Sequence, residues 1–160
     1  MLNRSSAIVA SILTASACSA PSGNQDSSIV GNWECRSHHD LEKSVIDVVG
    51  RYRYNEDGRA EADVDVTATW HDGFQVLFTS HATSNYQLQN QQLIATFEPT
   101  KSTIKQLNGE YTEAELSELR ESFLKGMFAG DDTDVFVRFE DDDIMLLSSG
   151  GDEPTTCQRH

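Results

Sequence analysis

The sequence predicts a mainly β protein: an antiparallel up-and-down meander of about eight strands that closes into a barrel, with one α-helix near residues 113–127. Three observations support this fold class. Apolar and polar residues alternate along much of the chain, three-residue turn motifs separate the alternating runs, and a single run has helical spacing. A meander of this size normally closes, because closure leaves no strand edge exposed.

Residues 1–17 have the pattern of a secretory signal peptide. MLNR carries one positive charge, AIVASILTASA is apolar or small, and small residues precede Cys18. The apolar run is too short for a transmembrane helix. Residues 18–28 would form a flexible tether, because they hold no residue able to anchor a core, and the barrel domain is expected over residues 29–160.

The four residues ASAC, ending at Cys18, resemble the lipobox of bacterial lipoproteins, in which the cysteine is acylated and becomes the mature N-terminus. The family usually has Leu where this chain has Ala15. The resemblance implies lipidation of Cys18 and a lipid-anchored protein of the cell envelope. In such lipoproteins the retention signal is usually an Asp directly after the cysteine. This chain has Ser19 there, which implies that the protein is anchored in the outer membrane and faces the periplasm. The alternative is ordinary secretion to the periplasm after Ala17.

The strongest alternation surrounds the tripeptide EDG, which ends at Gly58. Period-two alternation on both sides predicts two half-buried strands, and a three-residue loop with a left-handed Gly58 joins them as a type I turn plus bulge. In this register Arg53 faces Glu61 and Arg51 faces Asp63, so opposite charges meet on the outer face. This charge row is either a solvated sheet surface or a binding face.

The remaining strands follow the same pattern. GNWEC opens the first strand, and a second three-residue loop, HDG with Gly73, leads from Trp70 to the strand that starts at Phe74. The further strand-like runs are NYQLQ, LIATFE (stopped by Pro99), STIKQL (102–107), DVFVRF, IMLLS and TTCQR. Sequence neighbours are expected to pair in space, because short turns connect them.

One helix interrupts the strands. Thr112 and Glu115 have the spacing of a capping box, in which the two residues satisfy each other's backbone N–H groups. The following apolar stripe consists of Leu116, Leu119, Phe123, Leu124 and Met127. The stripe would either pack on the protein's own sheet or dock a partner.

A Gly-x-Trp motif on the first strand, here Gly31 and Trp33, followed by a meander resembles the lipocalins, and more closely the small bacterial lipocalin-like lipoproteins. The hairpin YRYNEDG and a basic residue near the end of the last strand, Arg159, match the same pattern. The resemblance spans roughly Ile29 to Arg159, and departs in placing the helix between middle and late strands. It implies that Trp33 packs at the closed end of the barrel beneath Arg159, in a structural role.

Cys35 and Cys157 lie on the first and last predicted strands, which barrel closure makes neighbours. Outside the cytoplasm a disulfide between them is favoured. We therefore predict a Cys35–Cys157 bond that fastens the seam of the barrel.

Residue sets for chemistry are sparse. The sequence has no Gly-x-Ser-x-Gly, glycine-rich phosphate loop or Cys-x-x-Cys, so we predict no enzyme and no cofactor. His38 and His39, expected in the turn after the first strand, are candidates for zinc or copper, and the acidic runs 130–134 and 140–143 for calcium. The acidic runs lack the ligand spacing of an EF-hand, and we predict no metal site.

The residues predicted to line the barrel interior alternate between small and large side chains. They are Tyr52, Tyr54, Ala62, Val64, Val66, Phe74, Val76 and Phe78. The small side chains either leave room for a ligand or are filled by the large ones. The first case predicts a non-catalytic binding module for a small hydrophobic ligand.

The net charge of −14 suggests an alternative. An acidic chain does not favour nucleic acid or an electrostatic grip on anionic lipid, so the only membrane contact expected is the lipid anchor. It permits a basic protein of the envelope as partner. The alternative function is thus an acidic interaction protein, such as an inhibitor of a cationic cell-wall hydrolase.

Overall fold

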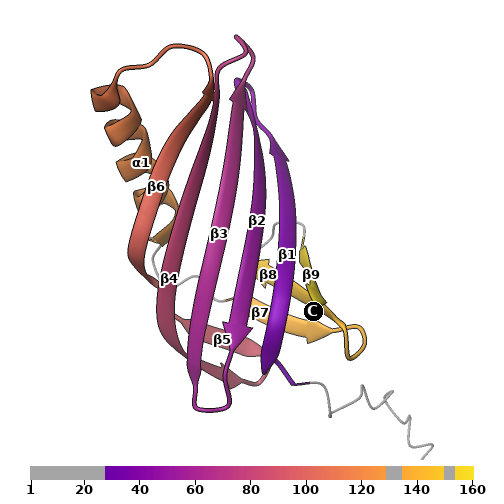
Figure 1. Ribbon diagram of the computed structural model, residues 1–160. Helices are drawn as coiled ribbons and strands as arrows, with labels where there is room; N and C mark the ends of the chain where they lie inside the picture. Colours follow the sequence, from indigo (N-terminus) through magenta and orange to yellow (C-terminus); the bar gives the residue numbers. More distant parts are fainter. Residues whose placement is uncertain (1–27, 129–134, 150–153) are drawn as a thin grey trace, which may run out of the picture.

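A computed structural model describes residues 28–128, 135–149 and 154–160. This part of the chain contains nine strands and one helix (Figure 1). In chain order they are β1 (Gly31–Asp40), β2 (Ser44–Tyr54), β3 (Arg59–Trp70), β4 (Gln75–Gln89), β5 (Gln92–Ala95), β6 (Glu98–Asn108), α1 (Glu113–Phe128), β7 (Val135–Phe139), β8 (Ile144–Ser149) and β9 (Thr155–Arg159). The signal peptide, Cys18 and nearly all of the tether lie outside the described residues.

Eight strands close into an antiparallel barrel, which confirms the predicted fold class. Hydrogen bonding runs β3-β2-β1-β9-β8-β7-β5-β4 and returns from β4 to β3. Four strands of this ring, β5 and β7 to β9, are short and lie together at one end of the molecule (Figure 1). We call this the closed end, and the opposite end, which only the long strands reach, the open end.

β6 is the ninth strand and lies outside the ring. β4 pairs through Gln75–Thr83 with β6 and through Tyr86–Gln89 with β5, so the two strands share one long neighbour. The sequence predicted a shorter strand over 102–107, preceded by a stop at Pro99. That boundary is wrong: β6 begins at Glu98 and contains Pro99, which an edge strand tolerates because one side of it needs no backbone donor.

The predicted turns are present. Gly58 (φ 79°) and Gly73 (φ 88°) are left-handed, as the two three-residue loops require. The β4–β5 turn instead uses Asn90 (φ 50°) and Gln91 (φ 68°). The predicted register of the first hairpin is confirmed, with Arg51 opposite Asp63 and Arg53 opposite Glu61.

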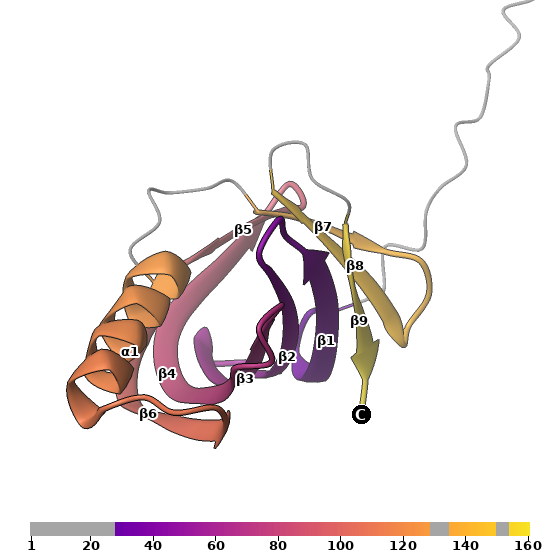
Figure 2. The ribbon, with the colours of Figure 1, turned by 90° about the horizontal axis from the view of Figure 1, so that it is seen from above.

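Helix α1 is confirmed between β6 and β7, and its apolar stripe packs on the protein's own barrel. Phe123, Leu124 and Met127 contact the cluster built on Val66 and Phe78, which lie on the inner face of β3 and β4. Leu116 and Leu119 contact a second cluster on the same face. Seen from above, α1 lies alongside β6 and next to the bend of β4 (Figure 2).

Candidate functional site

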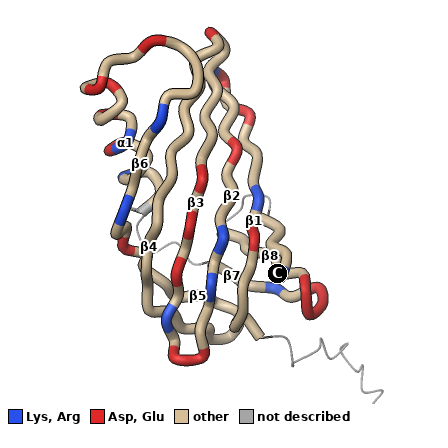
Figure 3. Tube along the Cα trace, viewed as in Figure 1, with Lys and Arg blue, Asp and Glu red and all other residues tan. Residues whose placement is uncertain are grey.

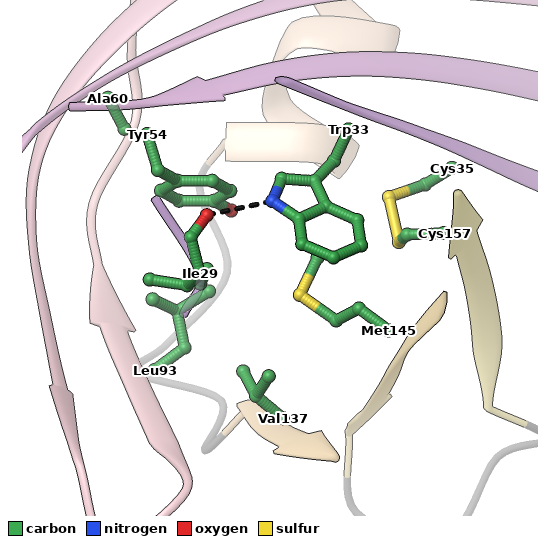
Figure 4. Packing of buried hydrophobic residues seen from close by; sticks show 9 residues of the cluster. All are labelled: Ile29, Trp33, Cys35, Tyr54, Ala60, Leu93, Val137, Met145 and Cys157. Carbon is green, nitrogen blue, oxygen red and sulfur yellow. Dashed lines mark hydrogen bonds between the residues drawn. A yellow bond between two sulfur atoms is a disulfide. The ribbon is translucent and has the colours of Figure 1, made fainter. Parts of the chain in front are cut away.

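The closed end of the barrel is built around Trp33. Its side chain is 1% exposed and its indole Nε1 donates a hydrogen bond to the carbonyl oxygen of Ile29 (2.7 Å). Tyr54, Leu93, Val137 and Met145 belong to the same buried cluster (Figure 4). Strands from both ends of the sequence contribute to this cluster, so it forms only when the barrel is closed.

Arg159 lies over the Trp33 ring, with the guanidinium carbon 4.3 Å from the ring centroid. Its nitrogens donate to three carbonyl oxygens: Nη1 to Val30 (2.8 Å), Nη2 to Ser28 (2.7 Å) and Nε to Asp142 (2.7 Å). The planar guanidinium group matches several acceptors at once, which an ammonium group does less well. Arg159 thus ties the entry of the chain into β1 to the last strand.

The predicted disulfide is confirmed. Cys35 and Cys157 are directly opposite each other in the β1–β9 ladder, and their sulfur atoms are bonded. Both cysteines are buried beside Trp33 (Figure 4). The covalent bond, the tryptophan and Arg159 therefore close the same end of the barrel.

The residues predicted to line the interior divide between two environments. Tyr54 belongs to the closed-end cluster. Tyr52 contacts both that cluster and the cluster built on Val66 and Phe78. The remaining predicted lining residues, Ala62, Val64, Val66, Phe74, Val76 and Phe78, are buried in the two clusters that α1 covers. Burial raises the pKa of the Tyr52 and Tyr54 phenols, so both stay neutral at physiological pH.

The helix therefore occupies much of the space that sequence reasoning left for either a ligand or large side chains. What remains accessible on the inner face is a set of half-buried apolar groups. Ile46 and Val48 of β2, together with Phe123, Leu124 and Met127 of α1, pack against the buried clusters yet keep part of their surface exposed. We call these five residues the inner apolar strip.

Arg120 was not identified from the sequence. It lies one helical turn after Leu116 and one before Phe123, within the apolar stripe of α1, and it is half-buried. Its position was a usable signal, because a cation in the middle of an apolar helix face needs a partner.

The outer face of the barrel carries paired charges. Figure 3 shows the basic residues of β2 beside the acidic residues of β3. Arg53 pairs with Glu61 (3.6 Å), but Arg51 pairs with Asp65 and not with the Asp63 opposite it. Asp63 is instead hydrogen-bonded through Oδ1 to His81 Nδ1 (2.8 Å). These mutual pairs make the charge row a largely self-compensated surface.

A polar groove of about 440 Å³ opens on this outer face. Its lining consists of Arg51, Asp63, Asp65, Thr79, Ser80, His81, Lys101, Ser102 and Thr103. Its carboxylates already bind Arg51 and His81, and Thr79 and Thr103 bond to each other (2.6 Å). Both carboxylates, Arg51, His81 and the two threonines are therefore engaged with one another.

The histidine prediction needs correction. His38 and His39 lie within β1 and not in a turn, because the ladder with β2 continues to the pair Asp40–Val45. His38 Nδ1 contacts Asp47 Oδ1 (2.7 Å), whereas His39 Nε2 contacts Ser37 Oγ (3.1 Å). Successive residues of a strand point to opposite faces, so the two rings do not share one site.

Among the described residues, no three His, Cys, Asp or Glu side chains gather as a metal ion would require. The acidic run 140–143 forms the tight connection between β7 and β8, and 130–134 lies outside the described residues. No described helix combines the length and apolar character needed to cross a membrane. The sequence matches no protein-family model, and none of the curated proteins compared with it is similar.

Proposed function

We propose that the chain is an exported, lipocalin-like envelope lipoprotein whose barrel holds a small apolar ligand without catalysing a reaction. The ligand site is the inner apolar strip at the open end of the barrel. The closed eight-stranded barrel and the Arg159–Trp33 packing at one end support the lipocalin-like assignment. The lipobox-like sequence before Cys18 supports the lipoprotein assignment.

One observation carries the binding proposal: apolar side chains on the inner side of the barrel are left partly exposed. Ile46 and Val48 point to the same side as the buried Val66 and Ala68, their cross-strand partners, yet they are only half-buried. Covering such surface stabilises a complex by roughly 25 cal/mol per Å². An apolar ligand between β2 and α1 would gain that energy.

The Cys35–Cys157 bond supports the envelope location. Disulfides persist in oxidising compartments such as the periplasm and are rare in the cytosol. The location is testable by palmitate labelling in a bacterial host. We expect label in the native protein and none in Cys18→Ser; label in neither would contradict the lipid anchor.

Ligand binding is testable with N-phenyl-1-naphthylamine, a neutral apolar dye that brightens in apolar surroundings. Val48→Trp should fill the strip and lower dye affinity by roughly tenfold or more. Val49→Trp is the matched control, because Val49 is also half-buried but lies opposite Asp65 on the outer face. Circular dichroism verifies that both variants fold. No dye binding to the native protein, or equal loss in both variants, would refute the proposed site.

The alternative is an acidic interaction protein that inhibits a cationic cell-wall hydrolase. The observation favouring it is a set of exposed carboxylates on α1, Glu113, Glu118 and Glu121. A lysozyme assay tests it directly. Inhibition that disappears in Glu118→Gln/Glu121→Gln would support this function, and uninhibited lysozyme would remove it.

A further inference from the structure

Arg120 is the cationic residue of the helix face that packs on the barrel. The stripe residues before and after it, Leu116, Phe123 and Met127, all contact the inner clusters of the sheet. Residues one or two turns apart on a helix share a face. Arg120 is accordingly half-buried, whereas Lys125 on the same helix is exposed.

Among the described residues, no side chain or carbonyl oxygen pairs with the guanidinium group of Arg120. Its Nε–H is buried and donates to no acceptor, and within the described part of the chain Arg120 takes part in no ion pair. By contrast, Arg51, Arg53 and Arg159 all bind carboxylate or carbonyl oxygens. Burying an unpaired donor of a charged group costs free energy, which a bound acceptor would recover.

We propose that Arg120 binds the anionic head group of the ligand, so that the ligand is an apolar molecule with a single acidic head. This inference rests on the proposed binding function and specifies its ligand class. The apolar body would lie on the inner apolar strip, and the carboxylate or phosphate oxygens would accept hydrogen bonds from the Arg120 guanidinium. Arg120 adjoins this strip, because Phe123, Leu124 and Met127 belong to both the strip and its helix face.

The overall charge of the chain makes this assignment specific. A chain with a net charge of −14 repels anions at long range, so an anionic ligand must be held by a local contact. At about 0.15 M salt, charges separated by more than about 8 Å are largely screened. The experiment is therefore run at that ionic strength, where loss of a remote positive charge has little effect.

The test compares decanoate, decyl phosphate and decanol as competitors of N-phenyl-1-naphthylamine. These probes share one alkyl chain and differ in the head group. In Arg120→Gln we expect the affinity for decanoate or decyl phosphate to fall by about 10-fold or more, and that for decanol to stay within about twofold. Lys125→Gln, which removes the same charge from the exposed side of the helix, should leave all three unchanged. The tighter of the two anions identifies the head group.

Two outcomes would overturn the proposal: anion affinity unchanged in Arg120→Gln, or an equal loss in Lys125→Gln. In either case dye and decanol binding would persist, and the proposed function would stand. If the native protein binds neither dye nor decanol, both inferences fail together.

The thermal stability of the ligand-free protein gives a second readout. Arg120→Met keeps an unbranched apolar stem and removes the unpaired charge. We expect its Tm to equal or exceed that of the native protein, because the buried Nε–H of Arg120 finds no acceptor among the described residues. A clear drop in Tm would show a structural role for Arg120 and contradict a ligand-binding one.

Discussion

Gly31 and Arg159 fit together with no room for a side chain between them. A Cβ atom on Gly31 would lie 2.6 Å from Nη1 of Arg159, and the φ angle of Gly31 is +138°, a conformation that L-residues rarely adopt. The glycine of the Gly-x-Trp motif is therefore required by the arginine that covers the tryptophan.

Gly31→Ala should destabilise the protein by about 2–3 kcal/mol, because it adds both a steric clash and backbone strain. Gly126→Ala is the control. Gly126 lies in α1 with nothing within 4 Å of the added atom, so alanine should stabilise the fold by up to about 1 kcal/mol. Urea unfolding measures both, and equal effects would contradict the account of Gly31.

Arg159→Lys should cost about 1–3 kcal/mol, although it keeps the charge. Lysine cannot reach the carbonyl oxygens of Ser28, Val30 and Asp142 at once or stack its head group flat on the indole. The matched change Arg138→Lys affects an exposed pair with Glu140 (3.5 Å) and should be nearly neutral. Thermal unfolding of both variants decides whether geometry or charge matters at position 159.

Reduction of the disulfide should lower the free energy of unfolding by roughly 4–5 kcal/mol in the chain-entropy model, because the bond joins residues 122 positions apart. The measurement is urea unfolding with and without dithiothreitol. A Cys35→Ser/Cys157→Ser variant should be insensitive to the reductant. A reductant-sensitive variant would show that the loss has another cause.

Thr112→Ala should destabilise α1 by about 1 kcal/mol through loss of its N-cap. Glu115 Oε2 accepts hydrogen bonds from the backbone N–H (2.8 Å) and hydroxyl (2.7 Å) of Thr112, which lower the pKa of Glu115 below its ordinary 4.5. A lowered folded-state pKa contributes stability that is present above pH 4.5 and is lost as pH falls through the lowered value. The difference between native and variant, followed by helical circular dichroism, should therefore shrink in acid.

The imidazole of His38 should titrate above its ordinary pKa of 6.5, because it is hydrogen-bonded to Asp47 and attracted by its charge. The stabilisation from this pair is complete below pH 6.5 and is lost as pH rises through the elevated value. Asp47→Asn should lower the His38 pKa in an NMR titration. Asp40→Asn should have a smaller effect, since Asp40 is the weakest contributor.

The parts of the fold that depend on short-range patterns were predictable. The first hairpin needs only alternation and a turn glycine, and its register from Arg51–Asp63 to Arg53–Glu61 is confirmed. The disulfide followed from barrel closure. The pairing of β5 and β6 with successive parts of β4 could not be predicted from the sequence. Nothing local to Gln92–Ala95 specifies that β5 also pairs with β7, which follows only after the helix.

The candidate site was less predictable than the fold. The stripe from Leu116 to Met127 identifies a buried helix face but not the surface that buries it, so the covering of Ala62 and Val64 by α1 was not foreseen. The role of Arg120 is hidden in the sequence for the same reason, because a cation in an apolar stripe is informative only once the surface that the stripe packs on is known. The polar residues around His38 predict a turn, whereas β1 continues through them because β2 extends the ladder opposite.

The seam between β1 and β9 also affects how the exported chain folds. β1 and β9 lie at opposite ends of the barrel sequence, so the seam edge of β1 from Trp33 to Arg36 has no partner until β9 docks. An open strand edge invites pairing with other chains. Glu34 and Arg36 place charges on the outer side of that stretch, where they pair with each other in the folded barrel. Charged side chains on an open edge disfavour pairing with other chains, so this stretch is protected against aggregation until the barrel closes.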